Sequence, residues 1–211
     1  GARLARVHLA GAPAFGAAPP GGPVDAWIGR APMRNVTGTD WPGWYAEHRV
    51  MPYLRLASDA GRLTTGEVAT VEAACSVLPQ VAGPPVPPAR LHGDLWSGNV
   101  CWSAGPARDG GARHGGCGHS GRTEAWLIDP AAHGGHPETD LAMLALFGCP
   151  HLDAVLDGYQ EVSPLAAGWH QRVGLHQLFP LLVHVVLFGR GYAGQAVAAA
   201  RSALRLANGI P

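Results

Sequence analysis

An aspartate and an asparagine five positions apart constrain this chain more than any other feature. They lie in the segment HGDLWSGN (92–99), which follows the apolar residue Leu91. A second aspartate, Asp129, ends the apolar run Trp126-Leu127-Ile128 further along the chain. Short apolar runs of this kind are typical of buried strands, and Gly, Asp and Asn favour the turns that end them. We therefore expect a fold that brings the two loops, and three oxygen-bearing side chains, together.

The same order of residues occurs in kinases that transfer a phosphoryl group, where a D-x-x-x-x-N loop precedes a strand and a metal-binding aspartate. A carboxylate within hydrogen-bond reach of a hydroxyl group can orient that group and accept its proton. Mg²⁺ neutralises charge on the phosphates of ATP and prefers oxygen ligands, such as a carboxamide and a carboxylate. We therefore predict that Asp94 is the catalytic base, and that Asn99 and Asp129 bind Mg²⁺ and ATP.

Each motif also has a structural interpretation. His-Gly-Asp can be a simple turn, and an aspartate before Pro130 can be a helix N-cap. The occurrence of both motifs in this order favours phosphoryl transfer. Within the loop, Trp96 either offers a flat apolar wall to a sugar ring or packs the loop itself. His92 is expected to support the loop structurally.

Composition limits the remaining classes of function. The chain has 211 residues, of which 47% are hydrophobic and 14% charged, so a sizeable core is expected and disorder throughout is not. The formal net charge at pH 7 is zero, so the charge of the chain does not indicate binding to nucleic acid or to an anionic membrane. No apolar run reaches about 18 residues, and the first residues lack the signal-peptide pattern. Four scattered cysteines indicate no disulfide framework. We therefore expect a cytoplasmic protein, and composition leaves its oligomeric state open.

Two absences concern nucleotide binding. The sequence contains no lysine, since all 15 basic residues are arginine, and no G-x-G-x-x-G segment precedes the loop at 92–99. Kinases use a glycine-rich loop and a strand lysine to hold the phosphates of ATP. The chain also does not begin with methionine. We therefore expect that the N-terminal, nucleotide-binding lobe is absent and that the chain resembles the middle of a longer protein.

Hydrophobic periodicity predicts a mostly helical chain. Helices are expected over 1–10, 41–56, 65–78, 139–148, 152–159, 171–188 and 192–206, with prolines 52 and 180 bending two of them. Two short apolar strands, 100–102 and 125–128, are expected to pair as a β-hairpin. Its tip would be extended by the glycine-rich insertion 103–124.

Three motifs resemble the fructosamine kinase (ketosamine-3-kinase) family, a branch of the aminoglycoside-phosphotransferase-like kinases. They are LHGDLWSGN (91–99), LIDPA (127–131) and GHPETDLAML (135–144). The resemblance implies a two-lobed, protein-kinase-like fold, of which residues 1–211 would form the C-terminal lobe. That lobe would be α+β, mostly α, with one small β-hairpin.

The resemblance also implies ATP-dependent phosphorylation of a sugar hydroxyl on a small-molecule or protein-linked ketosamine. Asp94 matches the catalytic aspartate of the family, and Asn99 and Asp129 match its metal ligands. Asp140 matches a buried aspartate that braces the catalytic loop through backbone N–H groups, and such bonds keep a carboxylate ionised.

Two alternatives remain open on the sequence. The missing lysine and glycine-rich loop also fit a truncated or catalytically dead module that acts by binding. A zinc site is a weaker alternative, because Cys and His are zinc ligands. The candidate ligands are His114, Cys117 and His119, with His133 and His136 downstream. His136 and Glu138 are otherwise expected either near the active cleft or on the solvated surface, and His184 in the interior.

Overall fold

The computed structural model describes residues 1–104 and 123–210, and helices dominate both ranges. The α-helices are α1 (Ala2–Leu9), α2 (Trp41–Tyr45), α3 (Met51–Asp59), α4 (Thr65–Val81), α5 (Pro137–Leu146), α6 (Leu152–Gln160), α7 (Trp169–Phe188) and α8 (Ala193–Ala207). A π-helical turn, η1 (Ala46–Val50), joins α2 to α3, and 3₁₀ turns lie at η2 (Ser97–Asn99) and η3 (Arg190–Tyr192). The predicted α+β, mostly α fold class is confirmed.

The strands form three separate antiparallel pairs. They are β1 (Asp25–Ile28) with β2 (Ala31–Arg34), β3 (Ala89–Leu91) with β6 (His133–Gly135), and β4 (Val100–Ala104) with β5 (Thr123–Leu127). The last pair is the predicted hairpin, with Cys101 opposite Trp126. The pairs β1–β2 and β3–β6 were not predicted from the sequence. Strands of three or four residues show too little alternation to be recognised.

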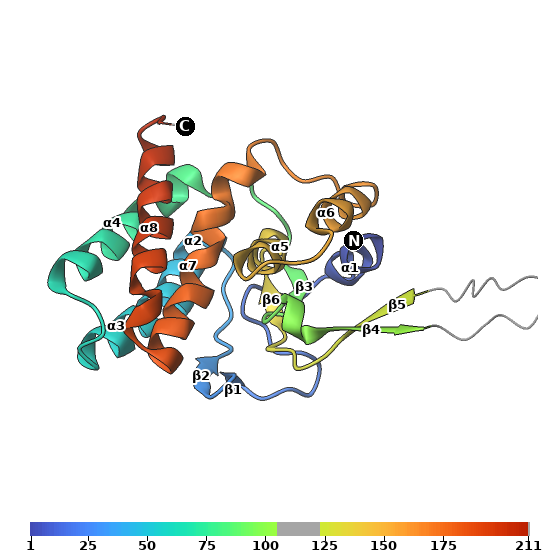
Figure 1. The fold of residues 1–211 in the computed structure, drawn as a ribbon, viewed down its shortest axis with the longest axis horizontal. Coiled ribbons are helices and arrows are strands. Elements are labelled where there is room, and N and C mark those ends of the chain that lie inside the picture. Colours follow the sequence, from blue (N-terminus) through green and yellow to red (C-terminus); the bar gives the residue numbers. More distant parts are fainter. Residues whose placement is uncertain (105–122, 211) are drawn as a thin grey trace, which may run out of the picture.

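Two groups of helices lie on either side of the β3–β6 pair (Figure 1), and each group has its own hydrophobic cluster. The larger cluster joins α3, α4, α7 and α8, whose inward faces are almost wholly apolar. The smaller cluster packs α1 and α6 against the loop after β3 through Leu4, Leu95, Leu141 and Tyr159. The loop at 92–99 and the start of α5 therefore lie between two packed helical groups, which fix their positions.

Helix α7 continues through Pro180, although proline has no N–H to donate to the carbonyl of residue 176. The hydroxyl of Tyr45, from α2, donates to the carbonyl oxygens of Leu175 and His176 at 3.0 and 3.2 Å. It also accepts from the N–H of Phe179 at 3.1 Å. A buried tyrosine thus satisfies the backbone groups that the proline leaves unpaired, and the predicted helix runs its full length.

Candidate active site on the loop after strand β3

Asp94 and Asn99 contact each other directly. The loop that carries them leaves β3 at Leu91 and returns through η2 into β4. The side-chain N–H groups of Asn99 donate to the backbone oxygen of Asp94 at 2.9 Å and to its carboxylate Oδ2 at 3.1 Å. Burial raises the pKa of Asp94, and the hydrogen bond from Asn99 opposes that shift. One carboxylate oxygen is therefore held in place, while Oδ1 takes no part in these bonds.

Asp129 lies beside the same loop. The N–H of Ile128 donates to the backbone oxygen of Asn99 at 3.1 Å, which ties the residue before Asp129 to the loop. Asp129 itself is exposed and has a backbone φ of 50°, in the left-handed region that non-glycine residues rarely adopt. Such strain is common at functional sites and persists where the surrounding structure fixes it. The structure thus places the second predicted loop next to the first.

His92 connects the two loops. Its Nε2 lies 2.9 Å from the carbonyl oxygen of Ile128, and its Nδ1 lies 3.3 Å from the N–H of Asp94. Since a carbonyl can only accept, Nε2 carries the hydrogen and Nδ1 is free to accept from Asp94. The buried ring therefore supports both loops at once, in agreement with the structural position predicted for it.

Asp140, in the first turns of α5, accepts hydrogen bonds from the backbone of the loop. Its Oδ2 accepts from the N–H of His92 at 2.7 Å, and its Oδ1 accepts from the N–H of Gly93 at 2.9 Å. The residue is 1% exposed. Burial alone would raise the pKa of this carboxyl, but the hydrogen bonds from His8 and the loop lower it. The bracing geometry that the resemblance implied is present.

One side-chain partner of Asp140, and the tyrosine that holds that partner, were not predicted from the sequence. His8 of α1 places its Nε2 3.1 Å from Asp140 Oδ2, and its Nδ1 lies 2.8 Å from the hydroxyl of Tyr159 in α6. Both are buried. The only signal in the sequence was a histidine one turn after Leu4 on the apolar face of α1. Its partners are 132 and 151 positions away, so the sequence does not indicate them.

Gly93 is required by the fold of the loop. Its φ is +82°, and a Cβ at this position would lie 2.1 Å from the carbonyl oxygen of Ala131. A larger residue would therefore separate the loop at 92–99 from the segment after Asp129. The close approach of the two candidate loops depends on this glycine.

Trp96 is 39% exposed and lies over the loop, not in the core. A Cβ at Gly98 would come within 2.1 Å of the indole ring, so this glycine leaves the space that the ring occupies. The rings of Trp96 and Phe147 are nearly perpendicular, with centroids 6.3 Å apart. The contacts with Gly98 and Phe147 are those of loop packing, and the exposed part of the ring leaves apolar surface free. The substrate wall stays a prediction.

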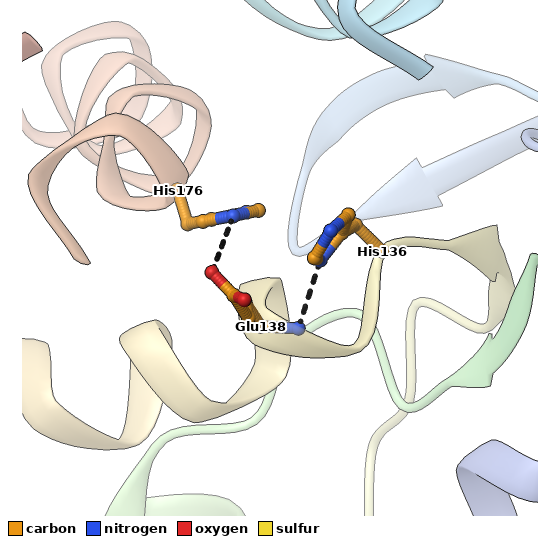
Figure 2. Close-up of side chains that lie close together, drawn as sticks. All are labelled: His136, Glu138 and His176. Atoms are coloured by element: carbon orange, nitrogen blue, oxygen red, sulfur yellow. Dashed lines mark hydrogen bonds and ion pairs between the residues drawn. The ribbon is translucent and has the colours of Figure 1, made fainter. Parts of the chain in front are cut away.

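A second polar cluster lies at the start of α5, where His136, Glu138 and His176 converge (Figure 2). The guanidinium of Arg172 donates to both carboxylate oxygens of Glu138, at 2.9 and 2.6 Å. His136 Nδ1 accepts from the N–H of Glu138 at 3.2 Å. His176 Nε2 lies 3.3 Å from Glu138 Oε2. All four residues are buried.

This cluster is better explained by an ion pair than by a metal. A guanidinium bound to both oxygens of Glu138 neutralises the carboxylate and repels a second cation. Burial lowers the pKa of His136 and of His176, so both rings are neutral near pH 7. His136 and Glu138 are therefore interior residues, and the expectation of surface solvation for them is wrong. The predicted zinc ligands His114, Cys117 and His119 lie outside the described residues.

We expect Glu138→Gln to destabilise the protein by about 3–5 kcal/mol, because it leaves the buried Arg172 without a counter-charge. Burial would raise the pKa of Glu138, but His176 and Arg172 lower it to about 2. The ion pair therefore stabilises the fold above the ordinary carboxyl pKa, and the contribution is lost as the pH falls from about 4.3 toward 2. Urea unfolding at pH 7 and pH 3 measures both effects. The matched control is Glu161→Gln on the surface, and equal losses in the two variants would contradict the prediction.

Comparison with known proteins identifies the family. The fructosamine kinase family model matches residues 1–205. The chain belongs to the fructosamine kinase family. A Thermobifida fusca protein with the provisional name fructosamine-3-kinase has a crystal structure that matches 96% of this chain with a TM-score of 0.82 and 53% sequence identity. The family expected from the three motifs is therefore confirmed.

Curated relatives carry names of the same kind. A Synechocystis protein provisionally named ketoamine kinase is 35% identical over 98% of this chain, and the chloroplastic protein-ribulosamine 3-kinase of Arabidopsis thaliana is 31% identical over 98%. The chain spans 61% and 56% of these two relatives, and 62% of the Thermobifida protein. These matches do not support the expectation that an N-terminal lobe is lacking, nor do they favour the truncated module.

Proposed function

We propose that this chain forms the C-terminal lobe of an ATP-dependent kinase that phosphorylates a sugar hydroxyl on ketosamine substrates. One observation supports this most strongly. Asp94, Asn99 and the strained turn at Asp129 are tied together by hydrogen bonds around one loop, in a chain that the fructosamine kinase family matches over residues 1–205. The predicted insertion 103–124 is shorter than expected at both ends, because β4 runs to Ala104 and β5 begins at Thr123; residues 105–122 lie outside the described residues.

Asp94 would orient the acceptor hydroxyl and receive its proton. Asn99 holds Oδ2, so Oδ1 is the oxygen that would face the substrate. The proton acceptor must be ionised, and burial that raises the pKa of Asp94 increases its basicity. Asp140 would act through the loop. Its carboxylate holds the backbone N–H groups of His92 and Gly93, the two residues before Asp94, and would thereby orient the side chain of Asp94.

The residues present suit Mg²⁺ and ATP. Asn99 uses its amide N–H groups on Asp94, so its amide oxygen remains available as a ligand. Asp129, which follows the residue bonded to the backbone of Asn99, adds an exposed carboxylate. Oxygen ligands of these two kinds are those that Mg²⁺ prefers. When bound, the ion would neutralise charge on the phosphates of ATP, and Asn99 and Asp129 are the residues that would hold it.

The expected acceptor is a small-molecule or protein-linked ketosamine. Among the described residues, no helix has the length and apolarity needed to cross a membrane. A cytoplasmic location and the absence of nucleic-acid and membrane partners stay predictions from composition.

The experiment is to purify the full-length gene product and to measure ADP release with a fructosamine or ribulosamine as acceptor. Mass spectrometry of the acceptor identifies the phosphorylated product, and the free ketose without an amine is the control acceptor. We expect turnover that requires both Mg²⁺ and the ketosamine. ADP release that is independent of every ketosamine would contradict the proposal, since it would indicate hydrolysis of ATP alone.

A further inference from the structure

A cluster of five partly exposed rings lies beside Asp94, and the proposed proton transfer does not use it. We call it the aromatic cluster: Trp96, Phe147, His184, Phe188 and Tyr192. Its centre is His184 of α7, whose ring centroid lies 4.6 Å from Phe147, 5.0 Å from Tyr192 and 5.3 Å from Phe188. Trp96 joins it through Phe147. The sequence led us to expect His184 in the interior, but its side chain is only partly buried.

The orientation of the His184 ring is fixed by one hydrogen bond. Its Nδ1 lies 2.7 Å from the carbonyl oxygen of Pro180. Because a carbonyl only accepts, Nδ1 carries the hydrogen, and Nε2 of the neutral ring bears a lone pair. The hydrogen bonds found among the described residues leave this Nε2 without a partner. The cluster thus surrounds one free hydrogen-bond acceptor with aromatic faces.

These features favour a cationic ligand over a neutral one. Aromatic faces attract a positive charge placed over them, and the attraction is strongest where the site is partly desolvated. Phe188 is 64% exposed and Trp96 is 39% exposed, so both rings are available to a ligand. Trp96 lies two residues after Asp94 on the same loop and contacts Phe147, so the cluster begins next to the proposed acceptor site. No arginine forms a cation–π contact with these rings among the described residues.

We infer that the aromatic cluster binds the protonated secondary amine of the acceptor, with His184 Nε2 accepting one of its N–H hydrogens. This inference rests on the proposed function and adds the residues that distinguish a ketosamine from an ordinary ketose. The sugar hydroxyl would lie at Asp94, and the amine and its substituent would extend across Trp96 toward α7. An acceptor whose amine is acylated has no positive charge there and lacks this interaction.

The test compares two acceptors that share one sugar. One is a ketosamine with a free secondary amine, and the other is its N-acetylated form. For the full-length gene product, we expect kcat/KM to be at least about tenfold higher for the cationic acceptor, the ratio that a charged hydrogen bond with one or two cation–π contacts supplies. The KM for ATP should be the same with both acceptors.

Two variants test the residues, and a third controls for helix α7. His184→Phe keeps an aromatic ring and removes the acceptor nitrogen, while Tyr192→Leu removes one aromatic face. Each should lower kcat/KM for the cationic acceptor by about tenfold and for the acetylated one by less than about twofold. The control is Trp169→Leu, at the other end of α7 and about 22 Å away by helical rise.

The outcomes separate this inference from the proposed function. Loss of the preference in His184→Phe and Tyr192→Leu, but not in Trp169→Leu, would support it. Equal kcat/KM for both acceptors in the unaltered protein would overturn it while leaving the kinase activity in place. Equal losses for both acceptors in the two variants would also overturn it, because they would indicate a packing role only. A protein that phosphorylates neither acceptor would refute the proposed function, and this inference with it.

Discussion

Replacing Asp94 with asparagine should lower kcat of the full-length gene product by about 10²–10⁴, the range that a positioned general base supplies. The substitution keeps the size of the side chain. In the unaltered protein Asn99 donates to Asp94 Oδ2 at 3.1 Å, and the amide oxygen of the new asparagine can still accept that hydrogen bond. The loop should therefore keep its shape, and the KM for ATP should change little. ADP release under saturating ATP and ketosamine measures the effect.

The pH dependence gives a second readout for the same variant. Only ionised Asp94 can accept a proton, so activity should rise with pH through the pKa of this group, which burial places above its ordinary value. In Asp94→Asn this acid limb should disappear. The matched control is Asp153→Asn, on the exposed face of α6, which should retain full activity. Equal rates in Asp94→Asn and the unaltered protein would remove Asp94 from the proposed role.

The elements of this fold that the sequence predicted are those with a long periodic pattern. Helices α4, α7 and α8 lie within a few residues of their expected bounds, because their apolar faces repeat over four or more turns. The pair β3–β6 has three residues on each strand, with glycine at two of the six positions. Its pairing depends on tertiary packing around it, which no local pattern records.

The candidate site divides in the same way. Asp94, Asn99 and Asp129 were predicted because each belongs to a short sequence motif, and the order and spacing of the two motifs are typical of phosphoryl transfer. The residues that hold the loop in place come from distant helices: His8 from α1 and Tyr159 from α6. Likewise, the pairing of Glu138 with Arg172 joins residues 34 positions apart. A single sequence gives residue types for such contacts but not the partners.

Replacing Asp140 with alanine should cost about 3–5 kcal/mol of folding free energy and abolish most activity. Its carboxylate is the common acceptor for the backbone N–H groups of His92 and Gly93 and for the ring of His8, all buried. Without it, two loop donors lose their partner, and each unsatisfied buried group costs about 1–3 kcal/mol. Urea unfolding measures the stability, and ADP release measures the consequence for Asp94.

A more conservative variant separates charge from shape at this position. Asp140→Asn has one acceptor oxygen where two loop N–H groups must be satisfied, so its amide N–H₂ would face a donor. The pKa of Asp140 is lowered, so its contribution to stability is present above the ordinary carboxyl pKa and is lost as the pH falls below about 4. The gap between the unaltered protein and Asp140→Asn should therefore shrink on acidification, while Asp157→Asn on exposed α6 should show no gap at any pH. A gap for Asp140→Asn that persists unchanged at pH 3 would mean that the ionised carboxylate does not brace the loop, and Asp94 would then owe its position to Asn99 and His92.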